Sequence, residues 1–211
     1  MLREQQFNDW PGMILVGPPG AGKSEYARAL GHTHGVPTIM LDLGALKGSL
    51  VGQSEEQIRA AMKIIKAVAG AGGAFFVATC NDLTVLPPEL RRRYTRGIWY
   101  FDLPDAAERQ AIWSVCLKRF GLGIDAARSF NDEGWTGAEI RNACESAWAL
   151  DQPIDVAARR VVPVSVSDPQ RIEKLRSLAD GKFLSASYPG TYRRQRATVA
   201  APAARAFQEG D

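Results

Sequence analysis

One stretch of the sequence decides the fold: residues 13–24 read MILVGPPGAGKS. The apolar run 13–16 is typical of a buried strand, and the glycines and prolines that follow it end the strand in a turn. Residues 17–24 fit the pattern G-x-x-x-x-G-K-[ST], in which a loop joins a strand to a helix. There the glycines let consecutive backbone N–H groups face a phosphate, and the helix N-terminus adds the positive end of its dipole. The stretch therefore predicts a phosphate-binding loop.

Two side chains of this loop have defined chemistry. The Lys23 ammonium can reach the β- and γ-phosphates of a nucleotide, and the Ser24 hydroxyl can ligate Mg²⁺. The alternative is a Gly/Pro turn beside a surface lysine, but strand and helix signals flank the motif on both sides. We expect ATP to bind here with Mg²⁺, through Gly17, Pro18, Pro19, Gly20, Ala21, Gly22, Lys23, Ser24 and Glu25.

Three further apolar runs predict strands beside the first one, at residues 38–41, 74–79 and 98–101. Helical signals lie between them. One helix is predicted from about residue 23 to 31, and another follows a capping box at residues 54–57. Strands that alternate with helices favour an α/β fold, here a parallel P-loop NTPase sheet with helices on both faces.

The chain changes character after residue 104. Two capping boxes predict the starts of helices with apolar stripes: Asp105 with Glu108, and Thr136 with Glu139. These helices form a small C-terminal α-helical lid in our prediction.

Weaker signals follow the two lid helices. Asp151 and Asp168 each stand shortly before a proline, as N-caps do, and residues 161–166 are a weak strand candidate. From about residue 195 the chain is rich in Ala, Pro and Arg, which is typical of disorder. We divide the chain into a P-loop α/β domain (1–104), a helical lid with a C-terminal extension (105–194) and a tail (195–211).

The amino-acid composition indicates what kind of protein this is, but it says little about function. Of the 211 residues, 45% are hydrophobic and 23% charged, as in packed soluble chains. The three cysteines are far apart, which argues against a disulfide framework or a zinc site. The N-terminus lacks a signal-peptide pattern and the longest uncharged stretch, 67–81, is too short to span a bilayer, so we expect a cytoplasmic protein without membrane contact.

The charge balance gives no support for nucleic-acid binding. The net charge is +3, and the tail from residue 191 contributes +2 of it, with four arginines against one Glu and one Asp. The body of the chain is therefore close to neutral, whereas nucleic-acid-binding domains carry a concentrated basic surface.

Several motifs, in the right order, resemble the AAA+ ATPase family between about residues 12 and 150. The segments that resemble family motifs are 17–24 (Walker A), 50–55 (pore loop), 78–81 (sensor 1 strand), 86–94 (arginine-finger region), 101–105 (the strand into the lid) and 135–141 (the sensor 2 helix). Segments 161–165 and 185–190 resemble a compact AAA-type group encoded in tailed-bacteriophage genomes. The resemblance implies ATP hydrolysis in a ring of identical subunits, such as a hexamer, that remodels a macromolecule. For a phage protein the location is the host cytoplasm.

The resemblance also implies roles for single residues. Asn81 would orient the attacking water, although a polar residue at a strand end can equally bond a loop. Arg93, with Arg92 as second choice, would reach the γ-phosphate in a neighbouring subunit; a solvated basic turn is the alternative. Arg141 would contact the nucleotide as the sensor 2 arginine, but it lies one residue beyond the expected position, and a surface ion pair is equally compatible.

One family feature is missing: the Walker B strand, an apolar run that ends in Asp-Glu. Between Gln57 and Ala78 the sequence has room for only one helix and a Gly-rich turn. If that strand is deleted, strand 38–41 can take its place beside strand 74–79, and Asp42 becomes a substitute Mg²⁺ ligand. Leu43 follows it, so no general base comes with it. A capping role for Asp42 is the alternative, and Asp82 and Glu55 are other acidic candidates.

Three interpretations of function remain. The first is an ATPase, favoured by Asn81 and the arginines at 91–93. The second is a nucleotide-gated assembly or partner-binding module without hydrolysis, favoured by the missing Walker B strand. The third is a DNA-associated loader or remodeller, which the near-neutral body of the chain does not support.

Overall fold

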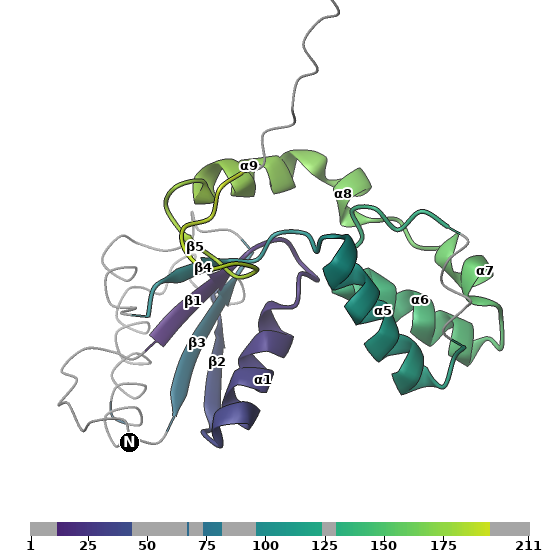
Figure 1. The fold of residues 1–211 in the computed structure, drawn as a ribbon, viewed down its shortest axis with the longest axis horizontal. Coiled ribbons are helices and arrows are strands. Elements are labelled where there is room, and N and C mark those ends of the chain that lie inside the picture. The colour runs from purple at the N-terminus through teal and green to yellow at the C-terminus, as the bar shows by residue number, and fades with distance from the viewer. Residues whose placement is uncertain (1–11, 44–66, 68–73, 82–95, 124–129, 195–211) are drawn as a thin grey trace, which may run out of the picture.

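The computed structural model describes residues 12–43, 67, 74–81, 96–123 and 130–194. At its centre lies a five-stranded sheet with the order β2-β3-β1-β4-β5 (Figure 1). The strands are β1 (Gly12–Val16), β2 (Thr38–Asp42), β3 (Phe75–Cys80), β4 (Ile98–Tyr100) and β5 (Leu184–Ser185). Each neighbouring pair is parallel. The parallel sheet predicted from the apolar runs is confirmed.

Helices cover both faces of the sheet. Successive residues of a strand point to opposite faces, and β1 is buried on both. Leu15 packs against Ala27 of α1 (Lys23–His34). Ile14 and Val16 belong to the apolar cluster that contains Leu175 of α9 (Pro169–Ala179). The carboxyl end of β1 is thus fixed from both sides, and the loop that follows it starts from a rigid support.

The first helix is three residues longer than predicted. Gly31 does not end it, because Gly31 lies where α1 meets β2: a Cβ at this position would be 2.1 Å from Thr38 Oγ1. The helix ends instead at Gly35, whose φ of 61° is left-handed and whose N–H donates to the carbonyls of Gly31 and His32. Gly31 therefore serves close packing of the helix on the sheet.

The lid has its own apolar core. Its helices are α5 (Ala106–Phe120), α6 (Gly137–Ala149) and α7 (Ile154–Ala158). Both predicted capping boxes are present, at Asp105 with Glu108 and at Thr136 with Glu139. Trp113 lies at the centre, in contact with the rings of Phe130 and Trp135.

The C-terminal extension returns from the lid to the sheet. The strand predicted at 161–166 is wrong, because Pro163 precedes a short helix, α8 (Val164–Ser167). Asp168 caps α9 as expected. Asp151 does not cap α7: it has a φ of 48°, and the helix starts only after Pro153. The parallel pairing of β5 with β4 was not predicted, because two residues are too short for a periodic pattern.

The order of the strands agrees with one expectation in particular. β2 pairs directly with β3, and Asp42 at the end of β2 is aligned with Thr79. This is the pairing predicted if strand 38–41 occupies the place of a Walker B strand.

Several predictions concern residues outside the described part of the chain. These are the capping box at 54–57 with Glu55, the pore-loop segment 50–55, Asp82, the arginines Arg92 and Arg93, and the tail 195–211. Within the described part, the three cysteines are buried and none of them forms a disulfide. None of the described helices has the length and apolar character needed to cross a bilayer.

Candidate nucleotide-binding site

The loop after β1 fits tightly between the ends of β3 and β4. The Gly17 N–H donates to the Cys80 carbonyl, with 3.3 Å between N and O. On the other side, a Cβ at Gly17 would lie 2.1 Å from the carbonyl oxygen of Phe101. A residue with a side chain cannot occupy this position without displacing the backbone after β4. The first glycine of the motif therefore sets how the loop leaves the sheet.

Lys23 is held beneath this loop. Its Nζ donates to the carbonyl oxygens of Gly17, at 2.9 Å, and Pro18, at 2.7 Å. The side chain is only 7% exposed. Burial lowers its pKa to about 8, and the negative charge of Asp42 opposes this shift. The hydrogen-bond partners of this buried ammonium are neutral carbonyls. An anion that binds beside it would stabilise its charge, and a phosphate is such an anion.

The N-terminus of α1 provides the second part of the site. Gly22 is its N-cap, with a φ of 88°, and no side chain caps the first turn. The starts of α5, α6 and α9, by contrast, are each capped by a side-chain oxygen. Uncapped amides at a helix start, with the positive dipole end, bind phosphate well. Ser24 lies half-buried in the same turn.

Asp42 and Asn81 reach the same edge of the sheet from neighbouring strands. Asp42 is the last residue of β2, Asn81 directly follows β3, and both residues are exposed. Asp42 is close enough to Lys23 for its charge to influence the lysine pKa. Leu43, in contrast, is 4% exposed and packs in the core with Leu41. Asp42 thus ends β2 near Lys23, the next side chain is buried in the core, and a role of Asp42 as a metal ligand stays a prediction.

The start of the lid helix α6 lies in contact with the loop. The Ala138 N–H donates to the Gly20 carbonyl at 3.3 Å. A Cβ at Gly20 would lie 2.7 Å from Thr136 Oγ1. Arg141, one turn later, is exposed and close enough to Cys116 of α5 for its charge to oppose the rise in that thiol's pKa. Its contact with a nucleotide stays a prediction.

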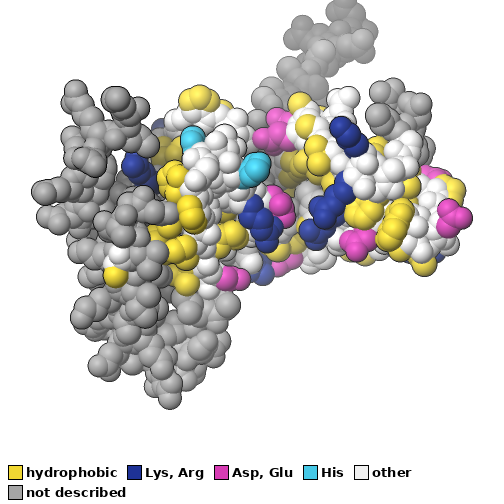
Figure 2. Space-filling view, turned by 90° about the horizontal axis from the view of Figure 1, so that it is seen from below, with side chains coloured by type: hydrophobic (Ala, Val, Ile, Leu, Met, Phe, Trp, Pro, Cys, Tyr) yellow, Lys and Arg dark blue, Asp and Glu magenta, His cyan; other side chains and the backbone are white. Residues whose placement is uncertain are grey.

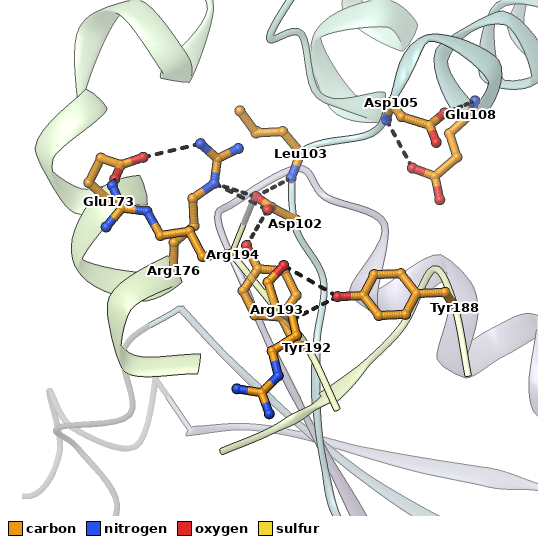
Figure 3. A network of polar contacts seen from close by, with 10 residues as sticks. All are labelled: Asp102, Leu103, Asp105, Glu108, Glu173, Arg176, Tyr188, Tyr192, Arg193 and Arg194. Atoms are coloured by element: carbon orange, nitrogen blue, oxygen red, sulfur yellow. Dashed lines mark hydrogen bonds and ion pairs between the residues drawn. The ribbon is translucent and has the colours of Figure 1, made fainter. Parts of the chain in front are cut away.

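A polar network anchors the residue that links β4 to the lid (Figure 3). The Asp102 carboxylate accepts hydrogen bonds from Arg176 Nε, at 2.9 and 3.1 Å, and from the Tyr192 hydroxyl, at 2.6 Å. Burial and the bond to Asp102 raise the pKa of Tyr192, so the hydroxyl stays protonated. The network therefore joins the C-terminal extension to the exit of β4.

Arg171 is a residue that the sequence analysis missed. It lies in the first turn of α9, and its positive charge contributes to the lowered pKa of Lys23. Arg171 is far from residues 17–24 in the sequence and belongs to a helix with many polar residues. No local pattern therefore indicated that it could influence Lys23.

The described residues offer no ready-made metal cage. None of them form a group of three or more His, Cys, Asp or Glu side chains that could hold an ion. Mg²⁺ in nucleotide sites usually has one or two protein ligands, with phosphates and waters filling the other positions. Ser24 with Asp42 matches that smaller set.

Comparison with known proteins points to one family. The model of the ATPase family associated with various cellular activities (AAA) matches residues 13–71. The AAA domain-containing protein ycf46 of Guillardia theta is 28% identical over 83% of this chain and 46% of its own length. The chain thus spans about half the length of this relative.

Two solved structures share the fold. A katanin structure, determined in a study of katanin self-assembly, has a TM-score of 0.55 and 19% identity, with 80% of this chain and 77% of that chain covered. The FIGL-1 AAA domain in complex with ADP has a TM-score of 0.50 and 19% identity, with 78% and 76% covered.

The alignment with ycf46 has more positions than this chain has residues in the aligned region. It runs over 233 positions, but only 83% of the 211 residues, about 175, take part. The relative therefore carries residues inside the matched region that have no counterpart here. The chain has the parallel-sheet fold of AAA P-loop NTPase domains, and its sequence is similar to that of AAA family ATPases.

Proposed function

We propose that this chain is an AAA-type ATPase that binds ATP with Mg²⁺ at residues 17–24. The observation that carries the proposal is the state of Lys23: a buried ammonium, held by loop carbonyls, beside an uncapped helix start. An ammonium and the free amides of a helix start are both groups that bind phosphate. The fold and the sequence similarity to AAA family ATPases point to the same chemistry.

Each residue of the site has a task in this proposal. Lys23 and the first amides of α1 bind the phosphates, and Gly17 and Gly20 keep the backbone close enough to do so. Ser24 and Asp42 hold Mg²⁺, which when bound neutralises charge on the β- and γ-phosphates. Asn81, at the exposed end of β3, orients the attacking water through its amide.

The alternative is a module that binds nucleotide without turnover, and Leu43 favours it. In the family pattern a glutamate follows the metal-binding aspartate, and here that position is a leucine buried in the apolar core. A carboxylate cannot reach the site from there. A deleted Walker B segment requires that relatives carry additional residues, and ycf46 does so within the matched region. We therefore expect hydrolysis to be slow under the first function and absent under the second.

The assembly belongs to the proposal as well. We infer a homo-oligomeric ring, such as a hexamer, in which Arg93 or Arg92 reaches the neighbouring γ-phosphate and ATP turnover remodels a macromolecule. The katanin structure concerns self-assembly of that protein. Cytoplasmic location and a phage origin remain predictions, since neither the relative nor the solved structures described above test them.

A DNA-binding role has little support. Figure 2 shows one face of the molecule, where Lys and Arg side chains alternate with acidic and apolar groups and form no continuous basic surface. Binding of DNA with a steep salt dependence would be needed to revive this third interpretation.

The test is to measure ATP affinity and ATP turnover on one preparation with Mg²⁺, for the unmodified chain and for Lys23→Ala. Turnover that disappears in the variant supports the ATPase. Binding without turnover supports the nucleotide-gated module. Absence of binding would contradict both.

A further inference from the structure

The backbone that leaves β4 supports the phosphate-binding loop directly. The Phe101 N–H donates to the Val16 carbonyl at 2.8 Å, so the chain after β4 runs beside the last residue of β1. Gly17 packs so closely on the Phe101 carbonyl that a Cβ there would lie 2.1 Å from the oxygen. The peptide that joins Phe101 to Asp102 therefore limits where the first residue of the loop can lie.

The side chain of Asp102 fixes this peptide from its other end. One carboxylate oxygen accepts a hydrogen bond from the Leu103 N–H at 2.8 Å, and both oxygens lie within 3.1 Å of Arg176 Nε. The Tyr192 hydroxyl donates to the second oxygen at 2.6 Å. In Figure 3 Arg176 reaches the carboxylate from α9 and Tyr192 reaches it from the segment after β5. A carboxylate with this many donors around it has few other positions to adopt.

The two donors belong to a segment that is itself fixed on the sheet. The ring of Tyr192 contacts the ring of Tyr100, with 4.5 Å between the centroids. The Tyr192 N–H donates to the Phe183 carbonyl at 2.7 Å. Leu175 of α9 packs in the same apolar cluster as Val16. The donors therefore cannot shift without disturbing packing against the strands that lead into the loop.

We propose that Asp102 is a positioning residue for the phosphate-binding loop, and that the C-terminal extension holds it through Tyr192 and Arg176. This inference rests on the proposed function. The extension fixes the Asp102 carboxylate, and the peptide before Asp102 fixes Gly17. Asp102 acts through Gly17, whose carbonyl also accepts a hydrogen bond from Lys23 Nζ at 2.9 Å. A tyrosine 90 residues further along the chain thereby controls the geometry in which the loop receives a phosphate.

The test removes one hydroxyl and keeps the ring that carries it. Tyr192→Phe deletes the hydrogen bond to Asp102 and leaves the ring packed on Tyr100. Tyr188→Phe is the matched control, because its hydroxyl belongs to the same extension but bonds the backbone of Arg193. A second variant, Asp102→Asn, removes the charge of the acceptor and keeps its shape.

Two properties are measured for the full chain and each variant. One is the affinity for ATP with Mg²⁺, and the other is hydrogen exchange of the amides of residues 17–24 without nucleotide. We expect Tyr192→Phe to lower ATP affinity about threefold or more and to speed exchange in the loop. Tyr188→Phe keeps its ATP affinity within about twofold and its exchange unchanged. Combining Tyr192→Phe with Asp102→Asn adds little to the larger single loss, because both substitutions weaken the same hydrogen bond.

The outcomes separate positioning from a general loss of stability. Ile154→Ala serves as the stability control, since Ile154 is 3% exposed in the core of the lid and lowers the melting temperature without touching the exit of β4. An equal loss of ATP affinity in Ile154→Ala or in Tyr188→Phe overturns the inference. Unchanged affinity or unchanged loop exchange in Tyr192→Phe overturns it as well. If the unmodified chain does not bind ATP, the proposed function fails, whereas the exchange experiment still tests the link from Tyr192 to the loop.

Discussion

Arg176 and Asp102 form a close ion pair across 74 residues of sequence, with Arg176 Nε 2.9 Å from one carboxylate oxygen and 3.1 Å from the other. The two side chains are 29% and 23% exposed, so water screens the pair only in part. Tyr192 adds its hydroxyl to the same carboxylate. Two side chains of the C-terminal extension therefore share one aspartate at the exit of β4.

Replacing Asp102 with alanine leaves two donors without their acceptor. We expect the free energy of unfolding to fall by about 2–4 kcal/mol, as for broken, partly buried charge networks. Urea denaturation measures it. Asp155→Ala is the control: its pair with the exposed Arg159 is 3.8 Å long, and its loss should cost less than about 0.5 kcal/mol. Equal effects of the two substitutions would show that the network is not an anchor.

Gly17→Ala tests the close approach of the loop to β4. The new Cβ would lie 2.1 Å from the Phe101 carbonyl oxygen, so the backbone must move. We expect a loss of stability above about 2 kcal/mol, together with loss of ATP binding. Gly123→Ala, whose Cβ would meet nothing within 4 Å, should leave both properties nearly unchanged. A stable Gly17→Ala variant that binds ATP normally would refute the packing argument.

The lowered pKa of Lys23 predicts a specific pH dependence. In the folded chain without nucleotide the lysine loses its proton near pH 8, and in the unfolded chain near 10.5. Between these values the unfolded state binds more protons, so the free energy of unfolding rises with pH through this window. The cost of burying the charge is present in full below pH 8. The Lys23→Met variant has no titrating group at this position. The difference between its free energy of unfolding and that of the unmodified chain, measured by denaturation at several pH values, gives the contribution of Lys23.

Nucleotide binding should show the opposite trend. Phosphate binding requires the charged lysine, so above pH 8 the chain must take up a proton to bind ATP. We therefore expect ATP affinity to decrease as the pH rises from 8 to 10. Titration calorimetry in buffers of different ionisation enthalpy detects the proton uptake. A flat profile would mean that Lys23 does not contact the phosphates.

Asp42→Ala tests the substitute metal ligand. Loss of even an outer partner of a metal ligand lowers metal affinity by about 10- to 100-fold. We expect at least about a tenfold loss in Mg²⁺-dependent ATP affinity, with little change when EDTA is present. Glu145→Ala, which removes one exposed acidic side chain from the lid, should have no effect. If Mg²⁺-dependent affinity does not change in Asp42→Ala, the metal assignment is wrong.

The parts of the fold that could be predicted have local signals. Residues 13–24 contain strand, turn and helix start in sequence, and the capping boxes at Asp105 and Thr136 need only residues three apart. Together with the apolar runs at 38–41, 74–79 and 98–101, these signals predicted the parallel sheet and the two capped helices after residue 104. Phosphate binding at residues 17–24 stays a prediction.

The parts that could not be predicted depend on contacts between distant residues. The two residues of β5 are a strand only because β4 lies beside them. Pro163 and Val164 form a helix start whose amide is bound by Glu139, 25 residues earlier. Arg171 looks like any polar residue of a helix, and only the folded chain shows that its charge influences the pKa of Lys23.

The short strand β5 also decides how the sheet ends on this side. A strand at the edge of a sheet offers unpaired backbone groups to other chains and can start aggregation. β4 is protected because β5 pairs with it, and β5 in turn forms an antiparallel bridge from Leu184 to Thr191. With only two residues in β5, almost no free backbone remains for a foreign strand to join. The extension that anchors α9 thus also shields this border of the sheet from unwanted polymerisation.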